Sequence, residues 1–445
     1  MLRSFSQRFN VAVERFLPNA FIFALLLTFL TLILGMTVTK QTFFEMTQHW
    51  YDGFWNLLAF TTQMILILVT GYALVKAPFV ERLLIRIASI PKTQKSALIF
   101  TISAAAISGY FSWGLGFVFG TLFAIEVAKR VPSADYRLLI AAAYTGTISI
   151  LPASITITAP LLVNTPEHSL EERIGLIPLS ETIFSPTLLL TAFIGLAVVF
   201  FAYIKMMPRE DEVIPFKGET EANETKVKEE PQNSNNLADR LNNSKIINYV
   251  LVGLGIVLLF QYFSAQGFNL ELNILNFFFI ILGLALHGSP IKYIQAVTEG
   301  MSSAAGILIQ FPFYAGIMGM MVGSGLITVV SESLVAVSNE FTFPLLSFIS
   351  AAIVNVFVPS AGGQWQIQGP IMVEAALALK LPASIAVNTV TIGDIVTNLI
   401  QPFFVLPALG LSGLGLKDIW GYTVVAMFLL LIVASVIVTF VPIIF

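Results

Sequence analysis

The chain alternates long apolar stretches with short polar segments. Most of the stretches approach about 20 residues, the length at which an α-helix spans the hydrocarbon core of a bilayer. The clearest are Ala20–Val38, Phe54–Leu74, Pro186–Ile204, Ile246–Phe263, Asn273–Leu286 with its flanks, and Gly421–Pro442. The core of a soluble domain explains one or two such runs but not a whole series. The pattern therefore predicts an all-α polytopic membrane protein.

Two further apolar stretches are interrupted in the middle. The stretch 97–128 is broken by Ser112, Gly114 and Gly116, and each arm has about 15 residues, too few to cross a bilayer at 1.5 Å per residue. Basic residues flank both of its ends, so both ends are expected on the same side of the membrane. The pattern predicts a re-entrant helical hairpin at 97–128 and a second one at 344–378. A broken transmembrane helix is predicted after each hairpin, at 138–163 and at 385–409.

Lysine and arginine mark the cytoplasmic side of a membrane protein. They gather in the N-terminal segment 1–19, in the loop around Lys92 and just after the first hairpin, whereas the segment from Gly323 to Leu379 contains none. The polar linker 205–245 is rich in Glu, Lys and Asn and lacks apolar periodicity, which is typical of a flexible tether. We expect segment 1–19 and the linker in the cytoplasm, and the region around Asn339 outside.

An offset of about 247 residues aligns one half of the chain with the other. The matching pairs are Gly53 with Gly300, Gln63 with Gln310, and Gly146 with Gly393. These matches predict one repeat at 20–204 and another at 265–445, joined by the linker and a connecting transmembrane helix at 246–264. An odd number of crossings separates the repeats, so their topologies are expected to be inverted. Inverted repeats with broken helices are typical of secondary transporters.

Composition narrows the function. The chain is 56% hydrophobic and 11% charged, and it contains no cysteine, which excludes disulfides, thiolate metal sites and a cysteine nucleophile. No H-E-x-x-H, G-x-S-x-G or P-loop motif is present, so an enzyme or an ATP-driven pump is not expected. The net charge of −3 says little about partners, and no nucleic-acid partner is expected. We expect the lipid bilayer and a small solute as partners, and the sequence leaves a homodimer open.

Candidate substrate-binding residues lie where helices break. Non-helical backbone at membrane depth persists only where protein buries it or where it lines a polar cavity. The candidates are Ser112, Trp113, Gly114, Gly116, Thr145, Gly146, Thr147, Ser360, Gly362, Gly363, Gln364, Trp365 and Gln368. Small and hydroxyl residues also pack membrane helices together, so each of these residues could instead be structural.

Asp394 is the most informative single residue. A carboxylate at membrane depth is costly and usually marks an ion or proton site, although a structural carboxylate at a helix break is the alternative. The predicted coupling-ion residues are Asp394, Thr391, Gly393, Thr397 and Asn398. The ion is H⁺ or Na⁺, with Na⁺ the only metal considered, and no other cofactor is expected. Glu126 is expected to pair with Lys129, whereas the sequence around Glu374 offers no basic partner.

Four motifs resemble the bacterial short-chain fatty acid transporter family. They are FWNLLAF at 54–60, SWGLGFVFG at 112–120, ILIQFPFYAGI at 307–317 and VPSAGGQWQIQGP at 358–370. The resemblance implies symport of acetoacetate- or butyrate-like monocarboxylates with H⁺ or Na⁺, by alternating access, across the inner membrane of a bacterial cell. It also implies a fold with two re-entrant hairpins. The residues alone lead only to a small solute coupled to a cation, and a channel or facilitator for small organic anions remains the alternative.

Overall fold

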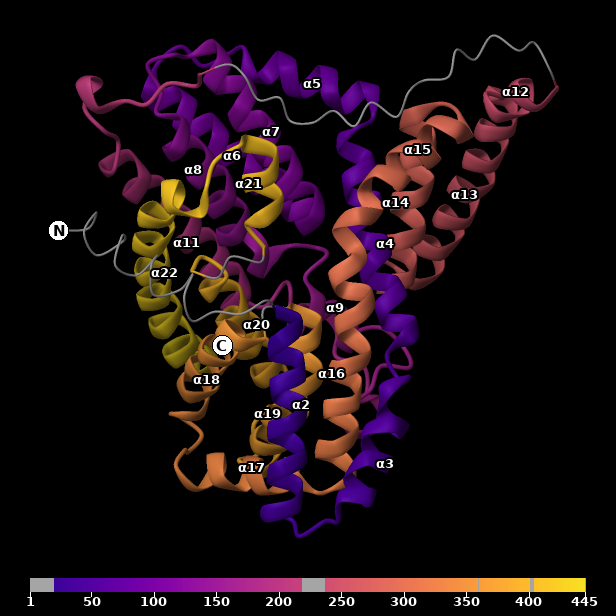
Figure 1. Ribbon diagram of the computed structural model, residues 1–445, viewed down its shortest axis with the longest axis vertical. Helices are drawn as coiled ribbons and strands as arrows, with labels where there is room; N and C mark the ends of the chain where they lie inside the picture. The colour runs from indigo at the N-terminus through magenta and orange to yellow at the C-terminus, as the bar shows by residue number, and fades with distance from the viewer. Residues whose placement is uncertain (1–19, 218–236, 359, 401–403, 445) are drawn as a thin grey trace.

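The computed structural model describes residues 20–217, 237–358, 360–400 and 404–444. The predicted cytoplasmic segment 1–19 and the central part of the predicted linker lie outside the described residues. Within the described ranges, all regular elements are helices, and the predicted all-α fold is confirmed (Figure 1). Six described helices are long and apolar enough to cross a membrane.

The helices of the first half run from residue 20 to the linker. They are α2 (Ala20–Thr37), α3 (Phe43–Phe54), α4 (Leu58–Val75), α5 (Pro78–Ala88), α6 (Gln94–Phe111), α7 (Trp113–Arg130), α8 (Tyr136–Ile150), η1 (Leu151–Ala153), α9 (Thr158–Val163), α10 (Glu171–Ile174), η2 (Leu179–Glu181), α11 (Pro186–Lys205) and η3 (Glu210–Glu212).

The second half begins within the linker. Its helices are α12 (Leu237–Asn242), α13 (Lys245–Gln266), α14 (Leu272–His287), α15 (Pro290–Met301), η4 (Ser302–Ala304), α16 (Ala305–Gly323), α17 (Leu326–Ala336), α18 (Phe343–Phe357), α19 (Ala361–Ala378), α20 (Ala383–Thr397), α21 (Leu406–Ser412) and α22 (Leu416–Ile444).

The two interrupted stretches form pairs of helices. One residue, Ser112, separates α6 from α7, and these two helices pack side by side and also contact α8. In the same way α18 packs against both α19 and α20. Figure 1 shows the first trio in the upper part of the molecule and the second trio in the lower part. The arrangement agrees with two related halves, while their opposite orientation in a membrane stays a prediction.

Glycine permits a close helix contact in each trio. A Cβ atom on Gly146 of α8 would lie 3.0 Å from the carbonyl oxygen of Ile102 in α6, and one on Gly393 of α20 would lie 2.6 Å from the carbonyl oxygen of Phe348 in α18. The two glycines are the pair that the sequence offset aligned. Their role is therefore close packing within each trio, since a larger residue would push the helices apart.

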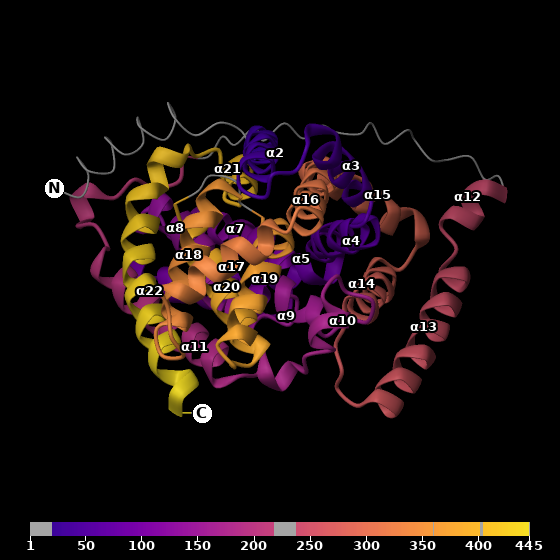
Figure 2. The same ribbon diagram turned by 90° about the horizontal axis from the view of Figure 1, so that it is seen from below.

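The outer helices present apolar side chains at the surface. On α13, Ile246 is 78% exposed and Phe260 is 73% exposed. Figure 2 shows α13 at one edge of the molecule and α22 at the opposite edge. Such surfaces are stable against lipid chains, because a bilayer solvates apolar side chains and the helix satisfies its own backbone.

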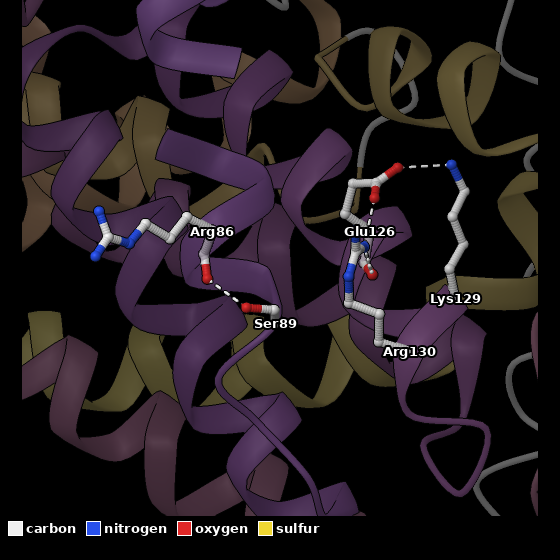
Figure 3. Close-up of polar contacts among 5 residues, drawn as sticks. All are labelled: Arg86, Ser89, Glu126, Lys129 and Arg130. Carbon is white, nitrogen blue, oxygen red and sulfur yellow. Dashed lines mark hydrogen bonds and ion pairs between the residues drawn. The ribbon is translucent and has the colours of Figure 1, made fainter. Parts of the chain in front are cut away.

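Ionic contacts gather at the end of α7. The carboxylate of Glu126 accepts from Lys129 at 2.6 Å and also from the guanidinium of Arg130, as predicted for a local ion pair (Figure 3). The guanidinium of Arg86 in α5 points away from these three side chains. The backbone carbonyl oxygen of Arg86 accepts from the Ser89 hydroxyl at 2.7 Å. The carboxylate of Glu126 is therefore neutralised locally.

Candidate substrate and ion site

A cavity of about 420 Å³ lies where the two helix trios meet α4 and the start of α16. Its wall is mostly apolar. The lining residues are Met64, Leu68, Tyr72, Trp113, Gly114, Phe117, Val118, Leu151, Ile157, Thr158, Ser302, Gly306, Ile307, Phe311, Ser360, Ala361, Gly362, Asp394, Ile395, Asn398 and Phe404. This described lining contains one carboxyl group and no lysine, arginine or histidine.

Serine residues cap the helices that begin at the two hairpin tips. Ser112 has extended backbone, and its Oγ accepts from the N–H of Leu115 at 3.4 Å at the start of α7. Ser360 has nearly the same backbone angles, and its Oγ accepts from the N–H of Gly363 at 3.3 Å at the start of α19. Both first turns line the cavity. Two positive helix ends therefore face it, and a helix N-terminus favours an anion.

The break after α8 is held by hydrogen bonds to the end of α6. The hydroxyl of Ser154 donates to the carbonyl oxygen of Gly109 at 2.8 Å, and the N–H of Ile155 donates to that of Tyr110 at 2.9 Å. The Oγ1 of Thr156 accepts from the N–H of Trp113 at 3.0 Å. The extended segment thus ties the first hairpin tip to the broken helix and satisfies backbone groups that would otherwise be costly at membrane depth.

Asp394 lies in the last turn of α20 and lines the cavity. Its side chain is buried, and within the described residues its Oδ1 has no hydrogen-bond partner. The C-terminal end of a helix is negative, so a carboxylate in the last turn is unfavourable without a compensating cation or proton. The position therefore suits a group that binds a cation or carries a proton.

Only some predicted site residues line this cavity. Trp113, Gly114, Ser360, Gly362, Asp394 and Asn398 are on its wall. The predicted residues that are not on its wall are Ser112, Gly116, Thr145, Gly146, Thr147, Gly363, Gln364, Trp365, Gln368, Thr391, Gly393 and Thr397. Whether any of these residues binds substrate or ion stays a prediction.

Several predicted residues away from the wall have structural contacts. Thr145 shares a hydrogen bond of 2.6 Å with the hydroxyl of Tyr203 in α11. The side-chain amide of Gln364 in α19 donates to the carbonyl oxygen of Ala351 in α18 at 2.9 Å. A Cβ on Gly363 would lie 2.4 Å from the ring of Tyr314, and one on Gly116 would lie 2.6 Å from the Cα of Gly109. These contacts hold helices together, which is the alternative that the sequence left open.

Most of the apolar wall was not predicted. Leu68, Tyr72, Phe117, Phe311 and Phe404 surround the space beside the hairpin tips. No sequence signal separates them from the lipid-facing residues on the same helices, because both surroundings are apolar.

The segment that includes α10 in the first half is fastened to α19 in the second half. Arg173 forms a bidentate pair with Glu374 of α19, with Nε–Oε1 at 2.6 Å and Nη2–Oε2 at 2.8 Å. The hydroxyl of Ser169 donates to Gln366 of the same helix at 3.0 Å. Glu374 therefore has a partner, which local sequence could not reveal because Arg173 lies 201 positions away.

A bundle of helices long and apolar enough to cross a membrane, with a mostly apolar cavity between two helix trios, is the architecture of a multi-pass membrane protein. The chain belongs to the short chain fatty acid transporter family, whose model matches residues 1–441. The resemblance seen in the motifs is thus confirmed. Membership also confirms that the protein is a transporter and not an enzyme.

Curated relatives agree with this assignment. Two curated relatives carry the name "Putative short-chain fatty acid transporter". The one from Escherichia coli (strain K12) is 41% identical over 415 residues, which cover 93% of this chain and 94% of the relative. The one from Haemophilus influenzae is 38% identical over 435 residues, which cover 96% and 97%.

The similar solved structures show the fold alone. The Alcanivorax borkumensis YdaH transporter has a TM-score of 0.58 and 16% identity, and the match covers 95% of this chain and 98% of that one. Neisseria gonorrhoeae MtrF, described in its title with a class of antimetabolite efflux pumps, has a TM-score of 0.53 and 15% identity, with 95% of both chains covered.

Proposed function

We propose that the protein takes up short-chain fatty acids of the acetoacetate and butyrate type across the bacterial inner membrane, by symport with H⁺ or Na⁺ and alternating access. The observation that carries the proposal is the pairing, in one cavity, of two helix N-termini with a single buried carboxyl group. The substrate carboxylate is held by the positive helix ends, and its alkyl chain lies against the apolar wall.

Charge balance supports coupling to a cation. Each helix end supplies about half a unit of positive charge, and the described lining has no basic side chain to add to it. A substrate anion beside an ionised Asp394 would leave uncompensated negative charge in a mostly apolar cavity, which is costly. A proton on the carboxyl group, or a bound Na⁺, restores neutrality. Substrate and cation therefore bind more favourably together than separately, which is the basis of symport.

The hairpins are the parts that we expect to move. The tips of α7 and α19 meet the same cavity from the two halves, so small displacements of either hairpin would open it to one side of the membrane. We further propose that the basic ends of the first half face the cytoplasm and that a homodimer is the form present in the membrane.

Uptake into proteoliposomes tests the proposed function. Labelled butyrate or acetoacetate should accumulate inside vesicles under an inward Na⁺ gradient or an inward proton gradient, and unlabelled acid inside should accelerate entry by counterflow. Large single-channel currents without counterflow would instead identify a channel. No protein-dependent movement of either acid under any gradient would reject the proposal.

A further inference from the structure

Three oxygen atoms at the end of α20 converge on one nitrogen atom of α18. The side-chain Nδ2 of Asn355 lies 2.7 Å from the carbonyl oxygen of Asp394, 2.7 Å from the Oδ1 of Asn398 and 3.0 Å from the Oγ1 of Thr397. All four residues are buried, and the side chain of Asn355 is fully so. The three oxygens thus converge on one position, which the side-chain nitrogen of Asn355 holds in this structure.

The side-chain NH₂ of Asn355 cannot donate a hydrogen bond to all three oxygens at once. This NH₂ group carries two hydrogens but faces three acceptors. The Thr397 hydroxyl donates to the carbonyl oxygen of Gly393 at 3.0 Å, so its oxygen can only accept at this point. Meanwhile the Oδ1 of Asn355 has no hydrogen-bond partner within the described residues. Rotating the amide by half a turn brings this fourth oxygen to face the other three.

The helix end makes the oxygens available. The N–H of Asn398 donates to the carbonyl oxygens of Ile395 and Val396 instead of continuing the α-helical ladder to Asp394. The carbonyl of Asp394 is therefore open to another partner at the negative end of the helix. Helix C-terminal ends and interrupted backbone are where transporters bind Na⁺, because oxygen ligands and the dipole both favour a hard cation.

We propose that these oxygens form a Na⁺ site. Its ligands are the carbonyl oxygen of Asp394, Oγ1 of Thr397, Oδ1 of Asn398 and, after the amide rotates, Oδ1 of Asn355. The Asp394 carboxylate is on a ligand residue and supplies the compensating charge, and Asp394 and Asn398 also line the cavity from which the ion enters. The inference rests on the proposed cation coupling and identifies the ion as Na⁺.

Thermal unfolding of the full-length protein in detergent tests ion binding without transport. We expect NaCl to raise the unfolding temperature above that in KCl of equal ionic strength, since a ligand of the folded state stabilises it. Asn355→Leu and Thr397→Val should each weaken the apparent Na⁺ affinity by about tenfold or more, the loss typical when the surroundings of a metal are disturbed. Equal unfolding temperatures of the wild-type protein in the two salts would overturn the site.

Asn355→Asp separates an ion ligand from a helix cap. Aspartate keeps the oxygen and loses the donor, so the site predicts a folded protein that still responds to Na⁺. If Asn355 only caps α20, the carboxylate would face three oxygens and destabilise the protein equally in both salts, and that result would refute the inference. Asn388→Leu is the matched control. Asn388 is also a buried amide, but it lies on α20 and donates to the carbonyl oxygen of Glu181 and the hydroxyl oxygen of Ser185. Its Na⁺ response should stay normal.

Where Asn355→Leu does not fold, the nearly isosteric Thr397→Val protein gives the result. Uptake distinguishes this inference from the proposed function. Butyrate accumulation driven by protons, together with no Na⁺ stabilisation, removes the Na⁺ site and leaves transport intact. Stabilisation by Na⁺ without uptake under any gradient supports the site and rejects the proposed substrate.

Discussion

The apolar wall of the cavity predicts how affinity changes with the length of the acid. At roughly 30 Å³ per water molecule, a cavity of about 420 Å³ has room for about fourteen waters, far more than one butyrate displaces. The wall beside the hairpin tips includes Met64, Leu68, Ile307 and Phe311. Acids somewhat longer than butyrate should therefore still fit, with each added methylene group buried against this wall.

The magnitude follows from the burial of methylene groups. Each contributes about 0.8 kcal/mol, or about fourfold in affinity, so the three methylenes that separate acetate from valerate give about 2.4 kcal/mol, or about sixtyfold. The assay is inhibition of labelled butyrate uptake by acetate, propionate, butyrate and valerate. Inhibition constants that stay flat across this series, or a sharp loss of inhibition beyond butyrate, would refute the assignment of this wall to the alkyl chain.

A matched pair of variants localises the effect. Val118→Phe fills part of the cavity and should weaken inhibition by valerate much more than inhibition by acetate. Val250→Phe adds the same volume on α13, where Val250 is 60% exposed, and should leave the whole series unchanged. Equal effects of the two variants would show that the added ring acts through folding or the membrane instead of the cavity.

Three other predictions concern topology, pH and packing. In the cysteine-free chain, a single cysteine at Lys92 should be labelled only from the cytoplasm and one at Asn339 only from outside, and labelling of both positions only from the cytoplasm would reject the inverted repeats. Burial lowers the pKa of His168, whose Nδ1 accepts from the N–H of Leu170 at 3.2 Å while Nε2 contacts the carbonyl oxygen of Gly175 at 3.1 Å. The folded state therefore favours the neutral ring. The contribution of His168 to stability should be present above a pH of about 6.5 and be lost as the pH falls below it, whereas His168→Gln should lack this loss. Unfolding temperatures compared across pH are the measurement. Gly393→Ala should destabilise the protein by about 1–3 kcal/mol because its Cβ overlaps α18. Gly253→Ala is the control and should not destabilise it, since no atom lies within 4 Å of the new Cβ. Equal unfolding temperatures of the two variants would contradict this packing.

The sequence predicted the helices because lipid imposes a simple rule. Predicted spans such as Pro186–Ile204 and Ile246–Phe263 agree with α11 and α13 to within a few residues, since a crossing needs a fixed length of apolar helix. The interruption at Ser112 was visible for the same reason: each arm of the stretch is too short to cross a bilayer, and basic residues flank both of its ends.

The candidate site was predicted less completely, because side-chain contacts depend on tertiary structure. Hydroxyl density pointed to Thr145, whose side chain bonds to Tyr203 instead of lining the cavity. Asn355 was not singled out, since its importance comes from the oxygens of α20 that tertiary packing brings around it. Glu374 lacked a partner in local sequence but pairs with a distant arginine. Asp394 could be selected because a carboxylate is costly at membrane depth wherever it lies.

The central claim is that Asp394 couples the movement of a cation to that of the acid, and Asp394→Asn tests it most directly. Asparagine keeps the shape of the side chain but removes its charge and its ability to carry the coupled proton. The measurement is butyrate accumulation in proteoliposomes under an imposed gradient, followed by counterflow in the same vesicles without a gradient. We predict that Asp394→Asn abolishes accumulation and preserves counterflow. A stably folded Asp394→Asn protein that concentrates butyrate as well as the wild type would contradict the account.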